Sequence, residues 1–217
     1  MLRPGEVVAA WELDEPPKAT TLVDSGPNRL DGRIGAQVLT GVTVKGATGH
    51  RREFVEPDQP PVAADRLAEV PDDDRLDPGD RDYEITIRLR TTAPQGNVAQ
   101  KGQFGADGGY FKIDMDEGRV ACLFLGAAGK SHVRSVASVA DGGWHQVRCL
   151  RSGDELVLWV DDVEVARRTA PTGTIANAYP LVMAGKLHCD QVAVFCDYFS
   201  GDLDRMVINR GSSAAPR

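Results

Sequence analysis

Paired carboxylates are the first groups in this sequence that could do chemistry. Glycoside hydrolysis uses two carboxyl groups that face one cleft, and residues two apart on a strand point to the same face. Asp114 and Asp116 have this spacing, but Gly118 follows closely and predicts that the pair lies in a turn. Glu12 and Asp14 are also two residues apart, but position 16, two residues after Asp14, does not carry a third carboxylate. The carboxylates therefore do not predict a catalytic strand.

Histidine chemistry is not indicated either. His145 follows Trp144, and a nucleophilic triad would need a Ser or Cys with an acidic partner. The sequence contains no G-x-S-x-G motif. His50, His132 and His188 are scattered without the spacing of metal ligands. These patterns therefore do not indicate a catalytic or metal-binding role for the histidines.

The four cysteines are Cys122, Cys149, Cys189 and Cys196, and they allow three pairings. Local closure favours Cys189 with Cys196, which leaves Cys122 to pair with Cys149 across neighbouring strands. The alternative is four reduced thiols, two of them small core residues. The spacing does not match the short CxxC units of a zinc site. Two disulfides would place the chain in an oxidising compartment.

The elements that must position these residues are β-strands. Tyr83, Ile85, Ile87 and Leu89 alternate with polar residues, which is typical of a strand with one buried face. The range 142–168 reads as an antiparallel meander with a tight turn at Asp161-Asp162. Turn signals recur at the roughly 8–12-residue spacing of a β-sandwich. We expect an all-β fold in one domain over residues 1–210, with a disordered tail over 211–217.

One stretch, 56–81, is rich in proline and aspartate and has two interpretations. It could be a linker between domains. Leu67, Val70 and Leu76 interrupt it, however, which favours a loop laid over the core with a short strand inside it.

Charge and hydropathy narrow the range of partners. The chain has 217 residues and a net charge of -7, from 25 basic and 32 acidic residues. This balance disfavours nucleic acid, because phosphate binding needs concentrated positive charge. No run approaches the roughly 18–20 apolar residues that span a bilayer. The first residues also lack the basic-then-apolar pattern of a signal peptide.

Several segments, taken in order, resemble bacterial laminin-G-like domains of the concanavalin A-like lectin and glucanase superfamily. They are WELDE with DSGPNRLDG, the stretch RLAEVPDDDRLDPGDRDYEITIRLRT, GGYFKIDMDEGRV, DGGWHQVRCLRSGDELVLWVDDVEVA, PLVMAGK and FSGDLDRMVI. The resemblance covers nearly the whole chain, and it implies that the Trp144-His145 pair serves packing. It implies a jelly-roll sandwich of two antiparallel sheets. The superfamily includes carbohydrate-binding modules, adhesion domains and glycan-cleaving enzymes, and the fold alone does not choose among them.

The resemblance also implies a structural calcium ion near the N-terminal loop and the last strand. The matching positions are Asp24 and Asp204, and Asn28 could add an oxygen. The family often has Asp-Glu on its last strand, whereas this chain has Arg205 after Asp204, which removes one carboxylate. The alternative is that Asp24 bonds its own turn and that Asp204 lies on the surface.

A glycan surface would combine aromatic faces with polar groups. The aromatic candidates are Trp159, Tyr110, Tyr198 and Phe199, while Trp11, Trp144 and Phe124 are expected in the core. An array of Arg88, Arg90, Arg134 and Arg148 would suit an acidic glycan if these arginines share one outward face. The predicted ligand-binding residues are Arg88, Arg90, Tyr110, Arg134 and Trp159.

The sequence thus predicts a non-catalytic binding module for a carbohydrate or an extracellular protein. We expect it to be secreted or at the cell surface, with a signal peptide that is not part of this chain. The alternatives are a hydrolase or lyase that cleaves glycans on the same fold, and a purely structural adhesion domain. The oligomeric state does not follow from the sequence.

Overall fold

The alternating segment from Tyr83 to Arg90 forms β7, the central strand of one sheet. The computed structural model describes residues 6–44, 47–52, 63–186 and 197–211. Along β7 every second side chain is buried, beginning with Tyr83, and the residues between are partly exposed. This period of two matches a strand with one face in the core and one face toward solvent.

The first sheet is antiparallel and is built around β7. Its order is β14-β13-β12-β7-β16-β5-β4, and β1 also pairs with β16. The strand bounds are β1 Glu6–Trp11, β4 Leu39–Val44, β5 Ala47–Arg52, β12 Trp144–Ser152, β13 Glu155–Val160, β14 Val163–Thr169 and β16 Gly201–Arg210.

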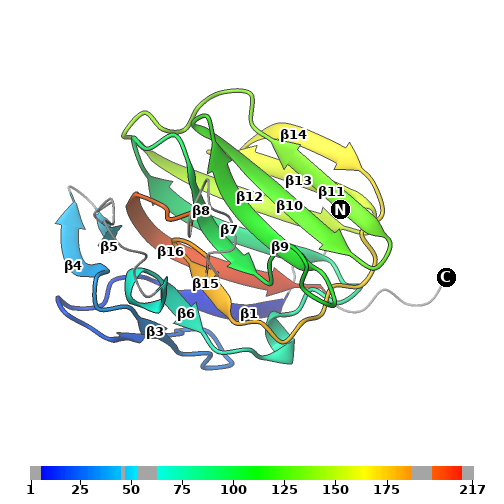
Figure 1. Cartoon of the computed structure of the whole chain (residues 1–217). Coiled ribbons are helices and arrows are strands. Elements are labelled where there is room, and N and C mark those ends of the chain that lie inside the picture. Colours follow the sequence, from blue (N-terminus) through cyan, green and yellow to red (C-terminus); the bar gives the residue numbers. More distant parts are fainter. Residues whose placement is uncertain (1–5, 45–46, 53–62, 187–196, 212–217) are drawn as a thin grey trace.

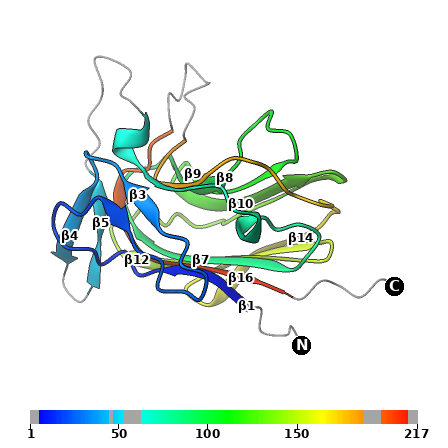
Figure 2. The same ribbon diagram turned by 90° about the horizontal axis from the view of Figure 1, so that it is seen from below.

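The second sheet is also antiparallel and has the order β11-β10-β9-β8-β15-β6-β3-β2. Its bounds are β2 Thr21–Leu22, β3 Gly32–Ile34, β6 Ala68–Val70, β8 Gly96–Lys101, β9 Tyr110–Asp116, β10 Arg119–Gly126, β11 Gly129–Arg134 and β15 Leu181–Met183. Two short 3-10 helices, η1 (Ala63–Arg66) and η2 (Asp74–Leu76), complete the assigned elements of the described residues. The two sheets lie face to face as layers (Figure 1; Figure 2). The predicted two-sheet jelly-roll sandwich is confirmed.

Aromatic rings fill the space between the layers. Tyr83 of β7 lies 5.3 Å from the ring of Phe111 on β9, and Phe111 lies 5.7 Å from Phe124 on β10. Such ring pairs add stabilisation beyond the area that they bury. The Tyr83 hydroxyl donates to the carbonyl oxygen of Leu76 at 2.8 Å, so its polar end is satisfied inside the core.

A disulfide joins the two layers. Cys122 on β10 is bonded to Cys149 on β12, with their Cα atoms 6.1 Å apart. The predicted pairing is confirmed, but the expectation that it crosses neighbouring strands is wrong, because β10 and β12 belong to opposite sheets. The predicted pair of Cys189 and Cys196 lies outside the described residues.

The predicted meander is present as β12, β13 and β14, which pair in sequence order. Asp161 and Asp162 connect the last two strands with φ angles of 51° and 63°. Two successive positive φ angles are the signature of the tight hairpin turn that favours aspartate.

The proline-rich stretch covers the core. Leu67, Val70 and Leu76 are all buried, and β6 within it pairs with β3 and β15. The covering loop with a short strand is therefore confirmed for the described part of the stretch. Among the described residues, no helix has the length and apolar character needed to cross a membrane.

The first and last strands of the described chain lie side by side. β1 pairs antiparallel with β16, and Glu6 stands opposite Arg210. The start of β1 and the end of β16 are therefore neighbours in the first sheet.

Candidate functional site

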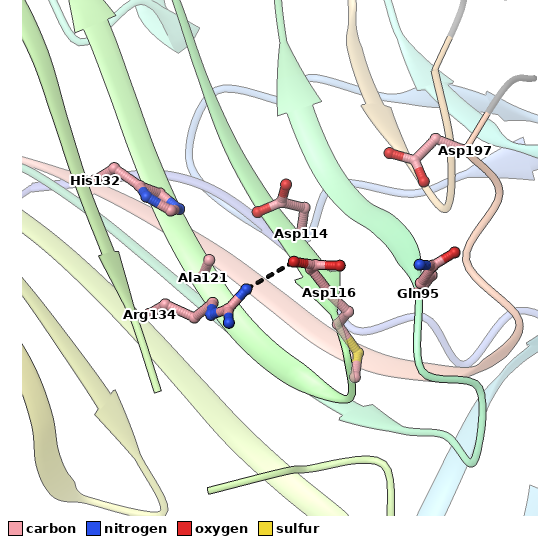
Figure 3. Close-up of a pocket in the computed structure, with 8 residues that line it drawn as sticks. Gln95, Asp114, Asp116, Ala121, His132, Arg134 and Asp197 are labelled. Carbon is pink, nitrogen blue, oxygen red and sulfur yellow. Dashed lines mark hydrogen bonds and ion pairs between the residues drawn. The ribbon is translucent and has the colours of Figure 1, made fainter. Parts of the chain in front are cut away.

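A pocket of about 240 Å³ opens on the outer face of the second sheet. Figure 3 shows its side chains, which come from β9, β10, β11 and the segments next to β8. Its lining residues are Gln95, Asp114, Met115, Asp116, Ala121, His132, Arg134 and Asp197.

The strand register explains why these side chains meet. Asp114 on β9 stands opposite Ala121 on β10, and Ala121 stands opposite Arg134 on β11. Directly paired residues share a face of the sheet. The single methyl group of Ala121 leaves space between the acidic and basic side chains, and that space is the floor of the pocket.

The next row across the sheet has the same layout. Lys112 on β9 stands opposite Leu123, and Leu123 stands opposite His132. Leu123 and Ala121 are buried but do not belong to the core cluster between the sheets. The outer face of the second sheet therefore has an apolar centre with polar side chains on both sides.

One wall of the pocket comes from a distant part of the chain. The backbone amide of Asn97 on β8 donates to the carbonyl oxygen of Asp197 at 2.8 Å. This bond fixes Asp197 beside β8, and Figure 3 shows its carboxylate across the pocket from Asp114 and Asp116.

The cations of the pocket are already paired. Arg134 binds Asp116 at 2.6 Å and Glu117 at 3.4 Å through its two terminal nitrogens. Lys112 forms an ion pair with one oxygen of Asp114. The other oxygen, Oδ1, is buried without a hydrogen-bond partner among the described residues. Hydrogen-bond acceptors are therefore in excess in the pocket.

Burial shifts the proton affinity of two pocket groups. Burial raises the pKa of Asp197; Lys186 and Lys112 oppose this change, whereas Asp114 and Asp116 add to it. Burial lowers the pKa of His132, so its imidazole is neutral near pH 7 despite the nearby Asp114. The pocket thus presents carboxylates, an amide and a neutral imidazole, which suit a ligand with many hydroxyl groups.

The five predicted ligand residues do not form one surface. Arg134 lines the pocket, and Tyr110 lies on the same strand as Asp114 but is buried. Arg88, Arg90 and Trp159 lie on the first sheet, in the other layer of the sandwich. The condition that these arginines share one outward face therefore holds for Arg88 and Arg90 but not for Arg134.

Trp159 does not present a free ring. The guanidinium of Arg148 lies 3.8 Å from the centre of its indole, and Arg148 also contacts Glu84 at 3.5 Å. A cation stacked on the ring covers one of the two faces on which a sugar could stack.

Trp144 was expected in the core, and that expectation is wrong. Its ring is half-buried and lies beneath two guanidinium groups, with Arg88 at 4.6 Å and Arg90 at 5.1 Å from the ring centre. Arg88 also pairs with Asp204 at 2.7 Å, and Arg90 pairs with Asp202. These arginines are held by carboxylates and rings, so they leave little free positive charge for an anion.

His145 also has a role that packing alone does not describe. Its Nδ1 lies 2.7 Å from Asp161 and its Nε2 lies 3.1 Å from Asp141. The ring thereby connects the loop before β12 to the hairpin turn after β13. Burial lowers the pKa of His145, but the hydrogen bonds to Asp161 and Asp141 outweigh this effect and the pKa is raised.

Asp24, a predicted calcium ligand, is held by the backbone. Its buried carboxylate accepts hydrogen bonds from the amides of Ala10, Gly26 and Leu30 at 2.8, 2.7 and 2.7 Å. This arrangement matches the alternative in which Asp24 bonds its own loop, extended by a bond to β1.

The other two predicted calcium ligands are engaged as well. Asn28 donates to the carbonyl oxygen of Val8 at 2.8 Å, and its Oδ1 lies 3.3 Å from Arg75. Asp204 is paired with Arg88. Over the described parts of the chain, no group of three or more His, Cys, Asp or Glu side chains could hold a metal ion. These residues as folded do not fit calcium, which takes six to eight oxygens, and calcium binding stays a prediction.

Sequence reasoning set aside the carboxylates that the pocket uses. Asp114 and Asp116 were placed in a turn because Gly118 follows them. Instead β9 continues to Asp116, and Glu117 and Gly118 alone form the turn, with φ angles of 51° and 76°. The Glu-Gly pair between two apolar runs was the available signal for this short hairpin.

Comparison with known proteins gives a match to a family model. The model, described as the laminin G domain, matches residues 89–211. Sex hormone-binding globulin from Phodopus sungorus is 30% identical over 92 residues, which make up 42% of this chain and 23% of that protein. This chain therefore spans about a quarter of that relative.

Solved structures share the fold at low identity. Domain 4 of AbnA, an extracellular arabinanase from Geobacillus stearothermophilus, has a TM-score of 0.66 at 12% identity, and the match covers 96% of this chain and 94% of that chain. Domains LG4-5 of the mouse laminin alpha1 chain have a TM-score of 0.50 at 20% identity, over 62% of this chain and 41% of that one. The binding domain of botulinum neurotoxin serotype D has a TM-score of 0.67 at 7% identity, over 96% and 48%.

Proposed function

This chain belongs to the laminin G domain family, and from that premise we propose that it is a non-catalytic binding module for carbohydrate. The ligand lies in the pocket on the outer face of the second sheet. One observation carries the proposal: polar side chains of β9 and β11 face one another across the small side chain of Ala121. A sugar presents hydroxyl groups at its rim and C–H groups on its faces, and this layout complements both.

Two neighbours of known structure support a sugar as the ligand. The arabinanase domain, which this chain matches over almost its full length, was solved in complex with arabinotriose. A carbohydrate-binding module from Ruminococcus gnavus, bound to α2,3 sialyllactose, has a TM-score of 0.50 at 15% identity over 63% of this chain. These likenesses concern the fold, and the pocket supplies the chemical argument.

We also propose that the chain works in the secreted or cell-surface environment. The disulfide between Cys122 and Cys149 supports this location, because such bonds persist mainly in oxidising compartments. Thiol titration of protein isolated from its native compartment tests it. The finding of two free thiols at these positions would contradict it.

The test of the binding site is a glycan array followed by calorimetry on the best oligosaccharide. Ala121→Leu fills the floor of the pocket without a change of charge, and we expect it to weaken binding at least about tenfold, a loss of ~1.4 kcal/mol. Thr86→Leu, on the outer face of the first sheet, is the matched control and should bind as the native protein does. If the control loses binding and Ala121→Leu keeps it, the site is on the first sheet. Failure of every glycan to bind would reject the proposal.

Glycan cleavage is the second candidate, and Asp197 favours it. Its raised pKa and its position across from Asp114 and Asp116 resemble the acid and carboxylate pair of glycosidases. Incubation with the bound oligosaccharide and assay for new reducing ends tests this alternative. Turnover that disappears in Asp197→Asn would replace the binding module with an enzyme.

A further inference from the structure

We infer that the pocket selects a sugar that carries a protonated amine and discriminates against acidic sugars. The inference rests on the proposed function, since it names the ligand class of the same pocket. It differs from the acidic glycan that the arginines suggested from the sequence.

The first step is the state of the cations. Both terminal nitrogens of Arg134 contact carboxylates, at 2.6 Å and 3.4 Å. Lys112 is paired with Asp114, and Lys186, whose charge acts on Asp197, is buried. A carboxylate or sulfate on a sugar would have to displace one of these partners and leave a carboxylate of the protein unpaired, which is costly.

The second step is the state of the carboxylates. Asp114 keeps one buried oxygen, Oδ1, with no hydrogen-bond partner among the described residues. Asp197 faces the same pocket from the opposite wall (Figure 3). Lys186 and Lys112 favour its charged form, whereas burial and the like charges of Asp114 and Asp116 disfavour it. Acceptors that lack donors are the groups a ligand must satisfy when it displaces water.

The third step is the chemistry that satisfies them. An ammonium group has three donors and no acceptor, and its hydrogen bonds to carboxylates are about twice as strong as those between neutral groups. It also brings a positive charge to Asp197, whose charged form is disfavoured by burial, Asp114 and Asp116, and a neutral hydroxyl brings no such charge. Acetylation of the amine removes the charge and two of the donors, so the acetylated sugar should bind more weakly.

The experiment compares three oligosaccharides of equal length by calorimetry at mildly acidic pH, where the amines of a chitosan oligomer are protonated. They are a chitosan oligomer with free amines, the chitin oligomer with acetylated amines, and an oligogalacturonate. We expect the chitosan oligomer to bind at least about tenfold more tightly than either of the others. Equal affinity for the first two, or tightest binding of the acid, would overturn the inference while the proposed function stands. If no sugar binds, both fail together.

Two variants distinguish binding in the pocket from a non-specific electrostatic attraction between chitosan and the acidic protein. Asp197→Asn should remove most of the preference for the amine and retain binding of the acetylated oligomer. Asp154→Asn alters an exposed turn between β12 and β13 and should leave the preference unchanged. The chain carries a net charge of -7, so chitosan binding that survives in Ala121→Leu would be non-specific, and that result would overturn the inference.

Discussion

The bond between Cys122 and Cys149 allows a quantitative test of how the sandwich is held together. The two residues are 27 positions apart in sequence and join opposite sheets. The loop-entropy relation gives a contribution of about 3.5 kcal/mol at 25 °C for a closed loop of this length. For a domain of this size, that free energy corresponds to a decrease of roughly 7–14 °C in the unfolding midpoint.

The disulfide is best removed by substitution of its two cysteines. Both sulfur atoms are buried, so a reductant reaches them slowly in the folded protein, and it would also act on the other two cysteines. The double variant Cys122→Ala with Cys149→Val removes the link and keeps the side-chain volume close to that of the original pair. Urea unfolding of the native and variant proteins then gives the difference in free energy.

A second measurement separates the loss of the link from changes in packing. Reductant present throughout unfolding and refolding should lower the midpoint of the native protein toward that of the double variant. We expect the variant itself to respond much less. A change below about 1 kcal/mol for the double variant would refute the reasoning, because it would mean that the unfolded chain gains little freedom when the bond is removed.

Further predictions concern buried and paired charges. Asp24→Asn should cost about 2–4 kcal/mol in urea unfolding, because three backbone amides lose a charged acceptor, whereas Asp14→Asn at an exposed position should cost little. Calcium added after treatment with EDTA should leave the melting temperature unchanged; an increase that Asp204→Asn abolishes would establish the predicted metal site. Lys101→Met should cost about 3–5 kcal/mol, because it leaves a buried carboxylate unpaired at Asp77; retention of full stability would contradict this. The pKa of His145 is raised in the folded state, so the stability it contributes is fully present below about pH 6.5 and is lost as pH rises through the folded pKa. The stability difference between the native protein and His145→Gln should therefore shrink with rising pH. A difference that is constant with pH would refute a stabilising role for the hydrogen bonds of His145 with Asp161 and Asp141.

The sequence predicted the sandwich well because its strands carry strong local patterns. The alternation along β7 and the Asp161-Asp162 turn depend on neighbouring residues alone, so they can be read without the rest of the chain. The covering loop was also recognised, because Leu67, Val70 and Leu76 are apolar within an otherwise polar stretch. Interactions among residues that are close in sequence were sufficient to predict these elements.

The pocket could not be predicted in the same way, because it depends on register and on distant contacts. Asp114 meets Arg134 only because both stand opposite Ala121, and a strand sequence does not state its partner. Asp197 is held at the site by a backbone hydrogen bond from Asn97 of β8. Because the sequence does not show which strands pair, Arg88 and Arg134 were predicted to share a face although they lie on different sheets.

The pairing of β1 with β16 determines how such a domain would respond to force. Because Glu6 stands opposite Arg210, polypeptide attached at these two points would join the domain about 5 Å apart, which is the distance between neighbouring strands. The folded domain would then lie to one side of a longer polypeptide, because its two attachment points are adjacent. It would add little to the extended length of that polypeptide. Tension along that chain would unzip the two strands one hydrogen-bonded pair at a time. Because Arg210 also stands opposite Tyr83, the same tension would act on the pairing of β16 with β7.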